Sequence, residues 1–290
     1  MHSGRKKRSR QKDGGGFCLL PWGKAFRDGA MREWSSACLA VLPVIAAHAN
    51  KEGEAWPSYE LICALASVSK GTVSKALEEL SRMGLVVISK QQGVNTYNRY
   101  RLCFGDYDGN SREHIAIYHK LIFSGCWGAM SPSTKRVYLL FRAFAWTGKN
   151  AVHLGHNEHP DDLEPIEVNI RGKWREFKHS EFNYLPDHIY APAEFTRLAG
   201  VSSRTFRNAL TWLVENGIFG LYDGTDDISG GLIIPFQPVV RFRSVVDAVE
   251  KVKKESAERK ARPGALRSIK ALRRRIALGK MPSSTNKEHL

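Results

Sequence analysis

Several features that mark particular classes of protein are scarce or missing in this sequence. Its five cysteines are widely spaced and form no Cys-x-x-Cys pair, so neither a zinc motif nor a disulfide framework is expected. The best apolar run, residues 37–49, contains a proline and is too short to cross a bilayer. A basic start with no apolar run behind it also argues against a signal peptide. We therefore expect a soluble protein in a reducing, cytoplasmic compartment, with no membrane partner.

Motifs of common catalytic sites are missing as well. The chain has no Gly-Lys-Ser/Thr phosphate loop and no His-x-His pair. Three histidines and two acids follow one another closely, but they stand among Gly, Asn and Pro, so an exposed loop is expected rather than a metal site: His153, His156, His159, Asp161 and Asp162. We expect no enzymatic activity, no bound metal and no cofactor.

Charge of one sign is absent from the middle of the chain and concentrated at its ends. The formal net charge of +15 divides into +5 from residues 1–13 and +10 from residues 251–290, while residues 14–250 hold 25 basic and 25 acidic side chains. Residues 1–16 read as a disordered basic arm, which could solubilise the chain, follow DNA phosphates or act as a nuclear import signal. Attraction to a polyanion must come from these ends and from local clusters, and should be strongly salt-dependent.

Residues 56–102 carry the pattern of a winged helix. Ser58 and Ser69 can cap two successive helices, and the second helix has an apolar stripe at i, i+3, i+4 and i+7 formed by Val73, Ala76, Leu77 and Leu80. Gly84 is placed to end that helix. Residues 85–89 and 97–102 then read as two strands around a polar loop, which is the pattern of a hairpin.

The same pattern occurs again 133 residues later. Nine of the 21 residues from Leu65 to Leu85 are identical to their counterparts, and they include the capping serine, part of the stripe and the final glycine. The identical residues of the second copy are Leu198, Ala199, Val201, Ser202, Thr205, Ala209, Leu210, Leu213 and Gly217. Two segments with this agreement are expected to share one local fold. The sequence therefore predicts a mainly α protein with small β-hairpin wings, an α+β fold of two tandem winged-helix domains.

The first copy resembles a known family. An apolar helix at residues 37–42, the loop motif His48-Ala49-Asn50 with Gly53 and Trp56-Pro57-Ser58, and a second helix opening with Ser69, Thr72 and Val73 are similar to the helix-turn-helix domain common in plasmid and phage replication proteins. The resemblance implies a winged helix, and it is less specific for replication because transcriptional regulators contain similar domains. The tandem arrangement is similar to plasmid replication initiators with two winged helices, by architecture and not by a residue motif.

These patterns divide the chain into five parts. After the basic arm, residues 30–104 form the first winged-helix domain, residues 105–130 a connector with a possible helix at 115–123, and residues 131–243 the second domain. An insertion at about 147–190 contains a predicted hairpin, which could be a dimerisation strand, a DNA-contacting arm or surface decoration. Residues 244–290 read as a basic helical tail, for which nucleic acid, a partner protein and a membrane surface are alternative ligands.

In a winged helix the second helix of the helix-turn-helix enters the major groove and the wing lies along the backbone. Both predicted recognition helices open without an acid, and the second offers arginine and asparagine side chains suited to base edges. The first domain's expected DNA contacts are Ser69, Lys70, Gly71, Thr72, Ser74, Lys75, Lys90, Gln91, Gln92, Asn95, Asn98, Arg99 and Arg101. The second domain's are Ser202, Ser203, Arg204, Thr205, Arg207, Asn208, Arg241 and Arg243. Nonspecific contacts are expected from the tail at Lys251, Lys253, Lys254, Arg259, Lys260, Arg273, Arg274 and Arg275.

Together these expectations describe a sequence-specific double-stranded DNA-binding protein. The first hypothesis is a plasmid or phage replication initiator that binds origin repeats and recruits a host helicase or other replication proteins. The alternatives are a transcriptional repressor that binds an operator as a homodimer, and a primosome or helicase-loading adaptor whose winged helices bind protein.

Overall fold

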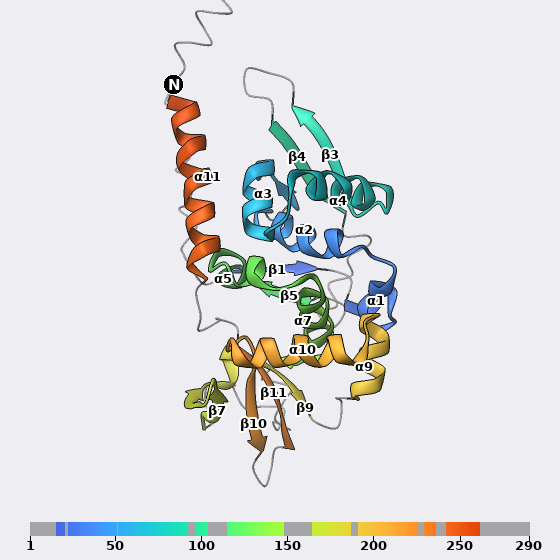
Figure 1. Ribbon diagram of the computed structural model, residues 1–290, viewed down its shortest axis with the longest axis vertical. Coiled ribbons are helices and arrows are strands. Elements are labelled where there is room, and N and C mark those ends of the chain that lie inside the picture. The colour runs from blue at the N-terminus through green and yellow to red at the C-terminus, as the bar shows by residue number, and fades with distance from the viewer. Residues whose placement is uncertain are drawn as a thin grey trace, which may run out of the picture.

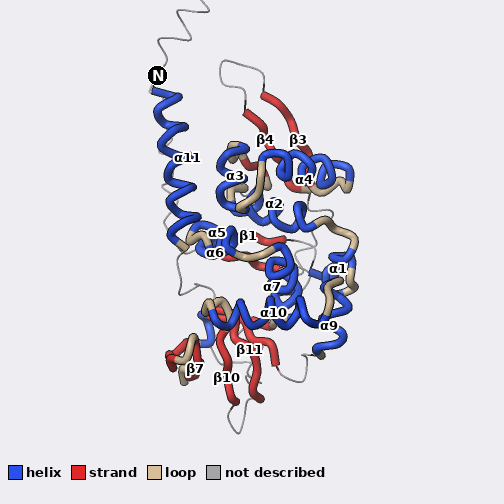
Figure 2. Tube along the Cα trace, viewed as in Figure 1, coloured by secondary structure: helices blue, strands red, loops and turns tan. Residues whose placement is uncertain are grey.

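The fold is α+β, with helices at the centre and antiparallel sheets at both ends (Figures 1 and 2). The computed structural model describes residues 16–20, 23–50, 52–91, 97–103, 115–147, 164–186, 191–224, 229–235 and 242–261. The predicted basic arm up to residue 15 and everything beyond Ala261 lie outside these ranges. Within them, no helix is both long and apolar enough to span a membrane.

The first unit contains the helix-turn-helix. Its elements are α2 (Ser36–Ala47), β2 (Glu54–Ala55), α3 (Tyr59–Ala66), α4 (Lys70–Arg82), β3 (Val86–Gln91) and β4 (Tyr97–Leu102). The strands form one antiparallel sheet in the order β2-β4-β3. We expected the first winged-helix domain to begin at residue 30, but its first helix α2 begins after Ser35, whose side chain accepts a hydrogen bond from the Cys38 amide at 3.1 Å. A capping oxygen at Ser35 therefore sets the start of α2.

The second unit repeats this order of elements with an insertion. Its elements are α7 (Pro132–Phe144), β6 (Trp146–Thr147), β7 (Ile166–Ile170), β8 (Lys173–Phe177), β9 (Phe182–Pro186), α9 (Pro192–Ala199), α10 (Ser203–Glu215), β10 (Gly220–Gly224) and β11 (Ser229–Pro235). They form a six-stranded sheet in the order β6-β9-β11-β10-β7-β8. Its segment β9-β11-β10 has the connectivity of β2-β4-β3. The insertion's predicted hairpin is present as β7 and β8.

Segments outside the two units join them at the centre. These are β1 (Phe17–Leu20), α1 (Gly23–Arg27), the 3-10 turn η1 (Ala30–Arg32), β5 (Ile115–Tyr118), α5 (His119–Phe123) and α6 (Cys126–Ala129). We expected one helix over residues 115–123, but its first four residues form a strand. They pair with β1, an element that the sequence reading did not anticipate, from Phe17↔Tyr118 to Leu20↔Ile115.

The helices stack through the middle of the molecule. α4 packs on α2, α2 on α7, and α7 on α10, so the hairpins β3-β4 and β10-β11 project from opposite ends (Figure 1). One hydrophobic core of buried residues runs through this stack from Leu20 to Val249. The division into two separate domains thus stays a prediction, because both units contribute to the same core.

The last helix, α11 (Arg243–Ala261), returns from the second unit to the first. It packs along α3 as a single long helix beside the body of the molecule (Figure 1). Val245 and Val249 are its buried contacts, and Val245 fits closely over Gly125 and Gly128, where an added Cβ would lie 2.9 Å and 2.8 Å from the valine side chain. The predicted helical tail is therefore docked over its first part.

Candidate nucleic-acid interface

The helices α4 and α10 begin in the same way. Ser69 Oγ accepts a hydrogen bond from the Thr72 amide at 3.1 Å, and Ser202 Oγ accepts one from the Thr205 amide at 3.1 Å. In each case the serine and threonine hydroxyls also lie within 2.9 Å of each other. Neither helix has an acidic residue in its first turn. The first turn of each helix thus has a positive dipole end and contains no carboxylate of its own.

The turns that lead into the two helices also coincide. Ser67 and Gly200, at equivalent positions, both have a left-handed backbone with φ of 55° and 63°. In both turns the next residue donates its amide to a carbonyl five residues earlier, Val68 to Cys63 at 3.1 Å and Val201 to Thr196 at 3.4 Å. The turn between α3 and α4 therefore has the same backbone geometry as the turn between α9 and α10.

The two helices end alike as well. Gly84 and Gly217 are left-handed, with φ of 70° and 65°, and the residue after each glycine donates its amide to the carbonyl of Leu80 or Leu213 at 2.9 Å. This is a Schellman ending, which needs glycine at that position. The cap, the turn and the ending predicted from the repeat are thus all present.

The outward faces of the two helices differ. In α4 the exposed residues include Lys70, Gly71 and Lys75, with Thr72 and Ser74 half-buried. In α10 the residues at the matching positions are Ser203, Arg204 and Asn208, with Thr205 half-buried and Arg207 exposed. Apart from the capping Ser69 and Ser202 and the threonines Thr72 and Thr205, every one of these matched pairs differs. The two copies of the repeat thus agree in the residues that form the helix and its cap, and differ in the residues on the outward face.

Two cations of the first unit have acidic partners that the sequence reading missed. Lys70 Nζ lies 3.0 Å from Glu60 Oε1, and this hydrogen bond lowers the pKa of the Glu60 carboxyl. Arg99 forms an ion pair with Glu54. Glu60 is on α3 and Glu54 on β2, so an inspection of α4 and the wing alone could not find them. These pairs reduce the positive potential of the first unit.

The first wing is placed only in part. Arg99 and Arg101 are exposed on β4, while Asn98 is half-buried and donates its side-chain amide to the Tyr100 hydroxyl at 3.3 Å. Lys90 and Gln91 lie at the end of β3, and Gln92 and Asn95 fall outside the described residues. Of the wing residues with described side chains, Arg101 is the exposed cation for which no acidic partner is seen among the described residues.

The second wing corrects one expectation. Arg243 was predicted on the returning strand, but β11 ends at Pro235 and Arg243 is the first residue of α11. β11 pairs with β9 as far as Pro235, which lies opposite Phe182 and has no amide hydrogen to donate to the ladder. Arg241, Asp226 and Asp227 lie outside the described residues, and Asp223 is exposed on β10. Arg243 is therefore not a residue of the wing.

The predicted tail contacts fall into three groups. Lys251, Lys253 and Lys254 are exposed on α11. Arg259 and Lys260 lie in the last turn of this helix, and Arg273, Arg274 and Arg275 lie beyond the described residues, as do the histidines of the insertion. Among the residues that the structure describes, no group of three His, Cys, Asp or Glu side chains could hold a metal ion.

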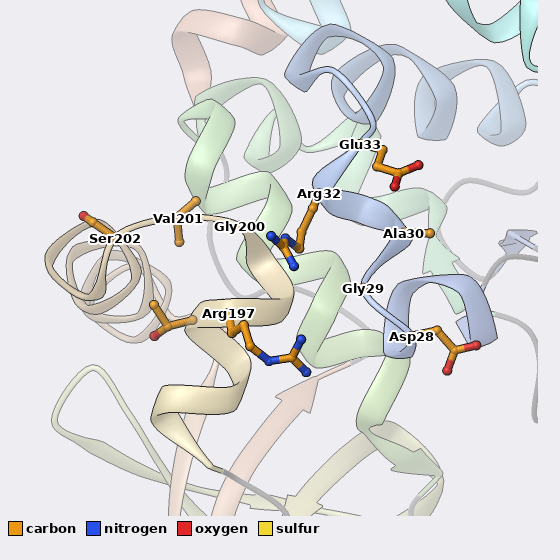
Figure 3. Close-up of a pocket in the computed structure, with 10 residues that line it drawn as sticks. Asp28, Gly29, Ala30, Arg32, Glu33, Arg197, Gly200, Val201 and Ser202 are labelled. Atoms are coloured by element: carbon orange, nitrogen blue, oxygen red, sulfur yellow. The ribbon is translucent and has the colours of Figure 1, made fainter.

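A residue of the first segment lies against the second helix-turn-helix. Arg32 of η1 faces an open cleft that is also lined by Arg197, Gly200 and Ser202 (Figure 3). The side chain packs so closely on the turn that a Cβ added to Gly200 would lie 3.0 Å from Arg32 Cγ. Arg197 is paired with Glu194 at 2.7 Å. No sequence signal connects Arg32 with a turn 168 positions away, so only the tertiary structure places this cation beside the turn before α10.

The helix α7 ties the two turns together. Lys135 Nζ donates to the Ala66 carbonyl at 3.2 Å, and Arg136 donates to the Ala199 carbonyl at 3.4 Å. Ala66 and Ala199 occupy equivalent positions, each being the last residue of the helix before its turn. Both cations are buried, and burial lowers the pKa of Lys135 to about 8. Two adjacent side chains of α7 thus contact both turns, and Arg136 also donates to the Trp34 carbonyl at 2.7 Å.

Comparison with known proteins agrees with the geometry of the first unit. A family described as a helix-turn-helix domain matches residues 35–86, which run from the cap of α2 to the first residue of β3. Neither the curated proteins nor the solved structures contain a match to the chain. Residues 35–86 therefore form a unit similar to a helix-turn-helix domain, and a domain of this kind implies DNA as a partner.

Proposed function

We propose that this protein binds double-stranded DNA in a sequence-specific manner through two winged helices, with α4 and α10 as the reading helices. The observation that carries the proposal is the conserved scaffold of the two helices combined with their altered outward residues. Arg204, Arg207 and Asn208 can each make two-point contacts with base edges, whereas Lys75 of α4 suits phosphate. The second unit is then the main base reader and the first unit mainly positions the protein.

The favoured cellular role is initiation of plasmid or phage replication. The protein would bind repeated origin sites from the cytoplasm, without chemistry of its own, and recruit a host helicase or other replication proteins. The resemblance of residues 37–73 to helix-turn-helix domains of replication proteins supports this role. The unlike surfaces of α4 and α10 also favour an asymmetric site for each chain over the single half-site of a simple palindromic repressor.

The contacts of α7 suit the reading of a compound site. Because Lys135 and Arg136 contact both turns, the chain can present the two reading helices as a unit. The basic residues beyond α11 would add sequence-independent attraction to phosphate. Nonspecific binding of DNA by the tail and recognition of the base sequence by the helices can then be measured separately.

Selection of bound duplexes from a random pool, followed by footprinting and titration at several salt concentrations, tests the proposal. Arg204→Ala combined with Arg207→Ala should weaken binding to the selected sequence by about tenfold or more and leave random DNA nearly unchanged. Removal of residues 262–290 should weaken binding to every duplex and flatten the salt dependence. Arg171→Ala combined with Arg175→Ala, which removes two exposed arginines from the β7-β8 hairpin, is the matched control.

The outcome that counts against the proposal is equally clear. If no sequence is enriched, the helices are not base readers and an adaptor that binds protein takes precedence. Enrichment of a palindrome protected by two chains would favour the repressor, and direct repeats would favour the initiator.

A further inference from the structure

The helices cover only half of one face of the six-stranded sheet. On β9 and β11 this face is part of the main core, with Leu185 and Leu232 buried at 1% and 8% exposure. The neighbouring Leu221 on β10 pairs directly with Leu232, yet it is 44% exposed. Beyond it, β7 and β8 extend past the end of α10 (Figure 1). The sheet therefore has a bare half on β10, β7 and β8.

Strand register shows which residues lie on this bare half. Leu221 pairs with Asn169, and Asn169 pairs with Trp174, so these three form one row across the strands. Trp174 is 52% exposed. Trp174 and Leu221 thus lie on either side of Asn169 in one row, and exposed apolar side chains on one small area commonly mark interaction sites.

The same half of the face is acidic. Glu167 pairs directly with Glu176 and shares the face with Trp174, as does Asp223 by alternation along β10. Two carboxylates directly opposite each other on antiparallel strands repel, which destabilises the hairpin. Lys173 and Arg175 point to the other face of β8. We call Glu167, Trp174, Glu176, Leu221 and Asp223 the acidic face.

This chemistry selects the kind of ligand. Three carboxylates exclude a nucleic-acid backbone, and they favour a cationic segment with apolar side chains for Trp174 and Leu221. Pairing of two β8 edges is also disfavoured. If β8 of one copy paired antiparallel with β8 of another so that the two Arg175 residues were opposite each other, like charges would face each other. If the two Trp174 residues were opposite each other, Lys173 of each copy would face Arg175 of the other.

We propose that the acidic face binds the basic segment 266–276 of a second copy of this chain. Between residues 262 and 280 there are seven Lys or Arg residues and no acid, with apolar residues at helical spacing: Leu266, Ile269, Leu272 and Ile276. The segment therefore offers both complements of the acidic face, cations for the carboxylates and an apolar stripe for the tryptophan and leucine.

The geometry of α11 directs this contact to another copy. α11 begins beside α5 and α6, between the two units, and runs along α3 away from the six-stranded sheet (Figure 1). Its 19 residues correspond to about 28 Å of helix. Residues 262–265 could return over at most about 14 Å. Because residues 262–265 span only about half the length of α11, a helical segment 266–276 cannot lie along the acidic face of its own chain. The contact therefore joins the tail of one copy to the sheet of the next.

Self-association of the full-length chain, measured by sedimentation after removal of nucleic acid, tests this proposal. The wild type should associate with increasing concentration at low salt and less at high salt. Glu167→Lys combined with Glu176→Lys should weaken association about tenfold or more, and so should Arg273→Glu with Arg274→Glu and Arg275→Glu. Glu250→Lys combined with Glu258→Lys, at exposed positions of α11, is the matched control and should associate as the wild type does.

A mixing experiment separates this contact from other causes. The Lys variant of the acidic face still has its tail, and the Glu variant of the tail still has its acidic face. The two should therefore form a one-to-one complex at concentrations where each alone stays mostly monomeric. Both changes in one chain should restore association through the exchanged charges. A wild type that stays monomeric at all concentrations, or a mixture that forms no complex, would overturn the proposal. Because the acidic face lies past the end of α10, opposite to the opening turn that holds Arg204 and Arg207, DNA selection by the Lys variant reports on the proposed function separately.

Discussion

At the scale of single residues, the two turns form an internal comparison. Ser67 and Gly200 adopt the same left-handed backbone, but only one of them is glycine. For a residue with a Cβ this conformation costs on the order of 1 kcal/mol. The backbone of the first turn is therefore strained at Ser67, whereas glycine avoids this strain in the second turn. Arg32 packs against the position that a Cβ of residue 200 would occupy.

Exchanging these two residues should change stability in opposite directions. Ser67→Gly should raise the free energy of unfolding by about 0.5 kcal/mol, since the relief of strain exceeds the added freedom of the unfolded chain. Gly200→Ser should lower it by about 1–3 kcal/mol, because backbone strain adds to the contact with Arg32. Urea denaturation followed by circular dichroism measures both, and equal signs would contradict the assignment of strain.

The buried Lys135 should make stability depend on pH. Burial lowers its pKa from 10.5 to about 8 in the folded chain, so between these values the unfolded chain binds more protons and stability rises with pH. The penalty is complete below pH 8 and is on the order of 3 kcal/mol at most. Hydrogen bonds to the Ala66 and Met130 carbonyls offset part of it.

Lys135→Met should remove this rise. The difference in unfolding free energy between wild type and variant should grow in favour of the wild type from pH 8 to pH 10.5. Tyr100 and Tyr138, whose pKa burial raises to about 12, titrate in both proteins and cancel in the difference. Parallel curves would mean that Lys135 keeps its ordinary pKa.

Sequence alone could predict the residues whose role is local. Ser69 and Ser202 were predicted as caps because a cap acts within three residues of itself. Glu54, Glu60 and Arg32 were not found, because each acts on a residue of another element. The candidate site was therefore predicted in its scaffold and missed in its electrostatic partners.

At the scale of elements, periodicity predicted the helices and hairpins well. The strand at 97–102, the hairpin inside the insertion and the helix end at Gly84 are all present as alternation and glycine indicated. The strand pair β1-β5 was missed because its two short strands lie almost 100 residues apart. Strands of four residues carry too little pattern to predict such distant pairing.

The docking of α11 is also a tertiary property, and it can be tested. Val249→Asp places a carboxylate in the buried seam with α3, so the helix should detach and the unfolding free energy should fall by about 2–4 kcal/mol. Limited trypsin digestion should then cleave faster after Lys251, Lys253 and Lys254. Ala248→Asp, on the exposed side, is the control, and equal cleavage rates in both variants would mean that α11 is not held by this seam.

At the scale of the whole molecule, the sequence repeat predicted two similar units, but it did not predict that they share one hydrophobic core. Apolar stripes indicate which face of an element is buried and leave open what it packs against. Here the first helices of both units, α2 and α7, pack on each other, and one core results. The basic termini were visible in the composition, whereas the acidic face depends on register across three strands and could not be predicted from it.

The unlike residues on α4 and α10, two helices whose leading turns both contact α7, have a consequence for any duplex that both helices engage. Such a complex has no twofold axis within one chain, so the bound protein distinguishes upstream from downstream. Reversing the site would reverse the molecule, with β3-β4 and β10-β11 exchanging ends. A single copy therefore gives the DNA a direction, and a row of copies joined tail to sheet would all point the same way.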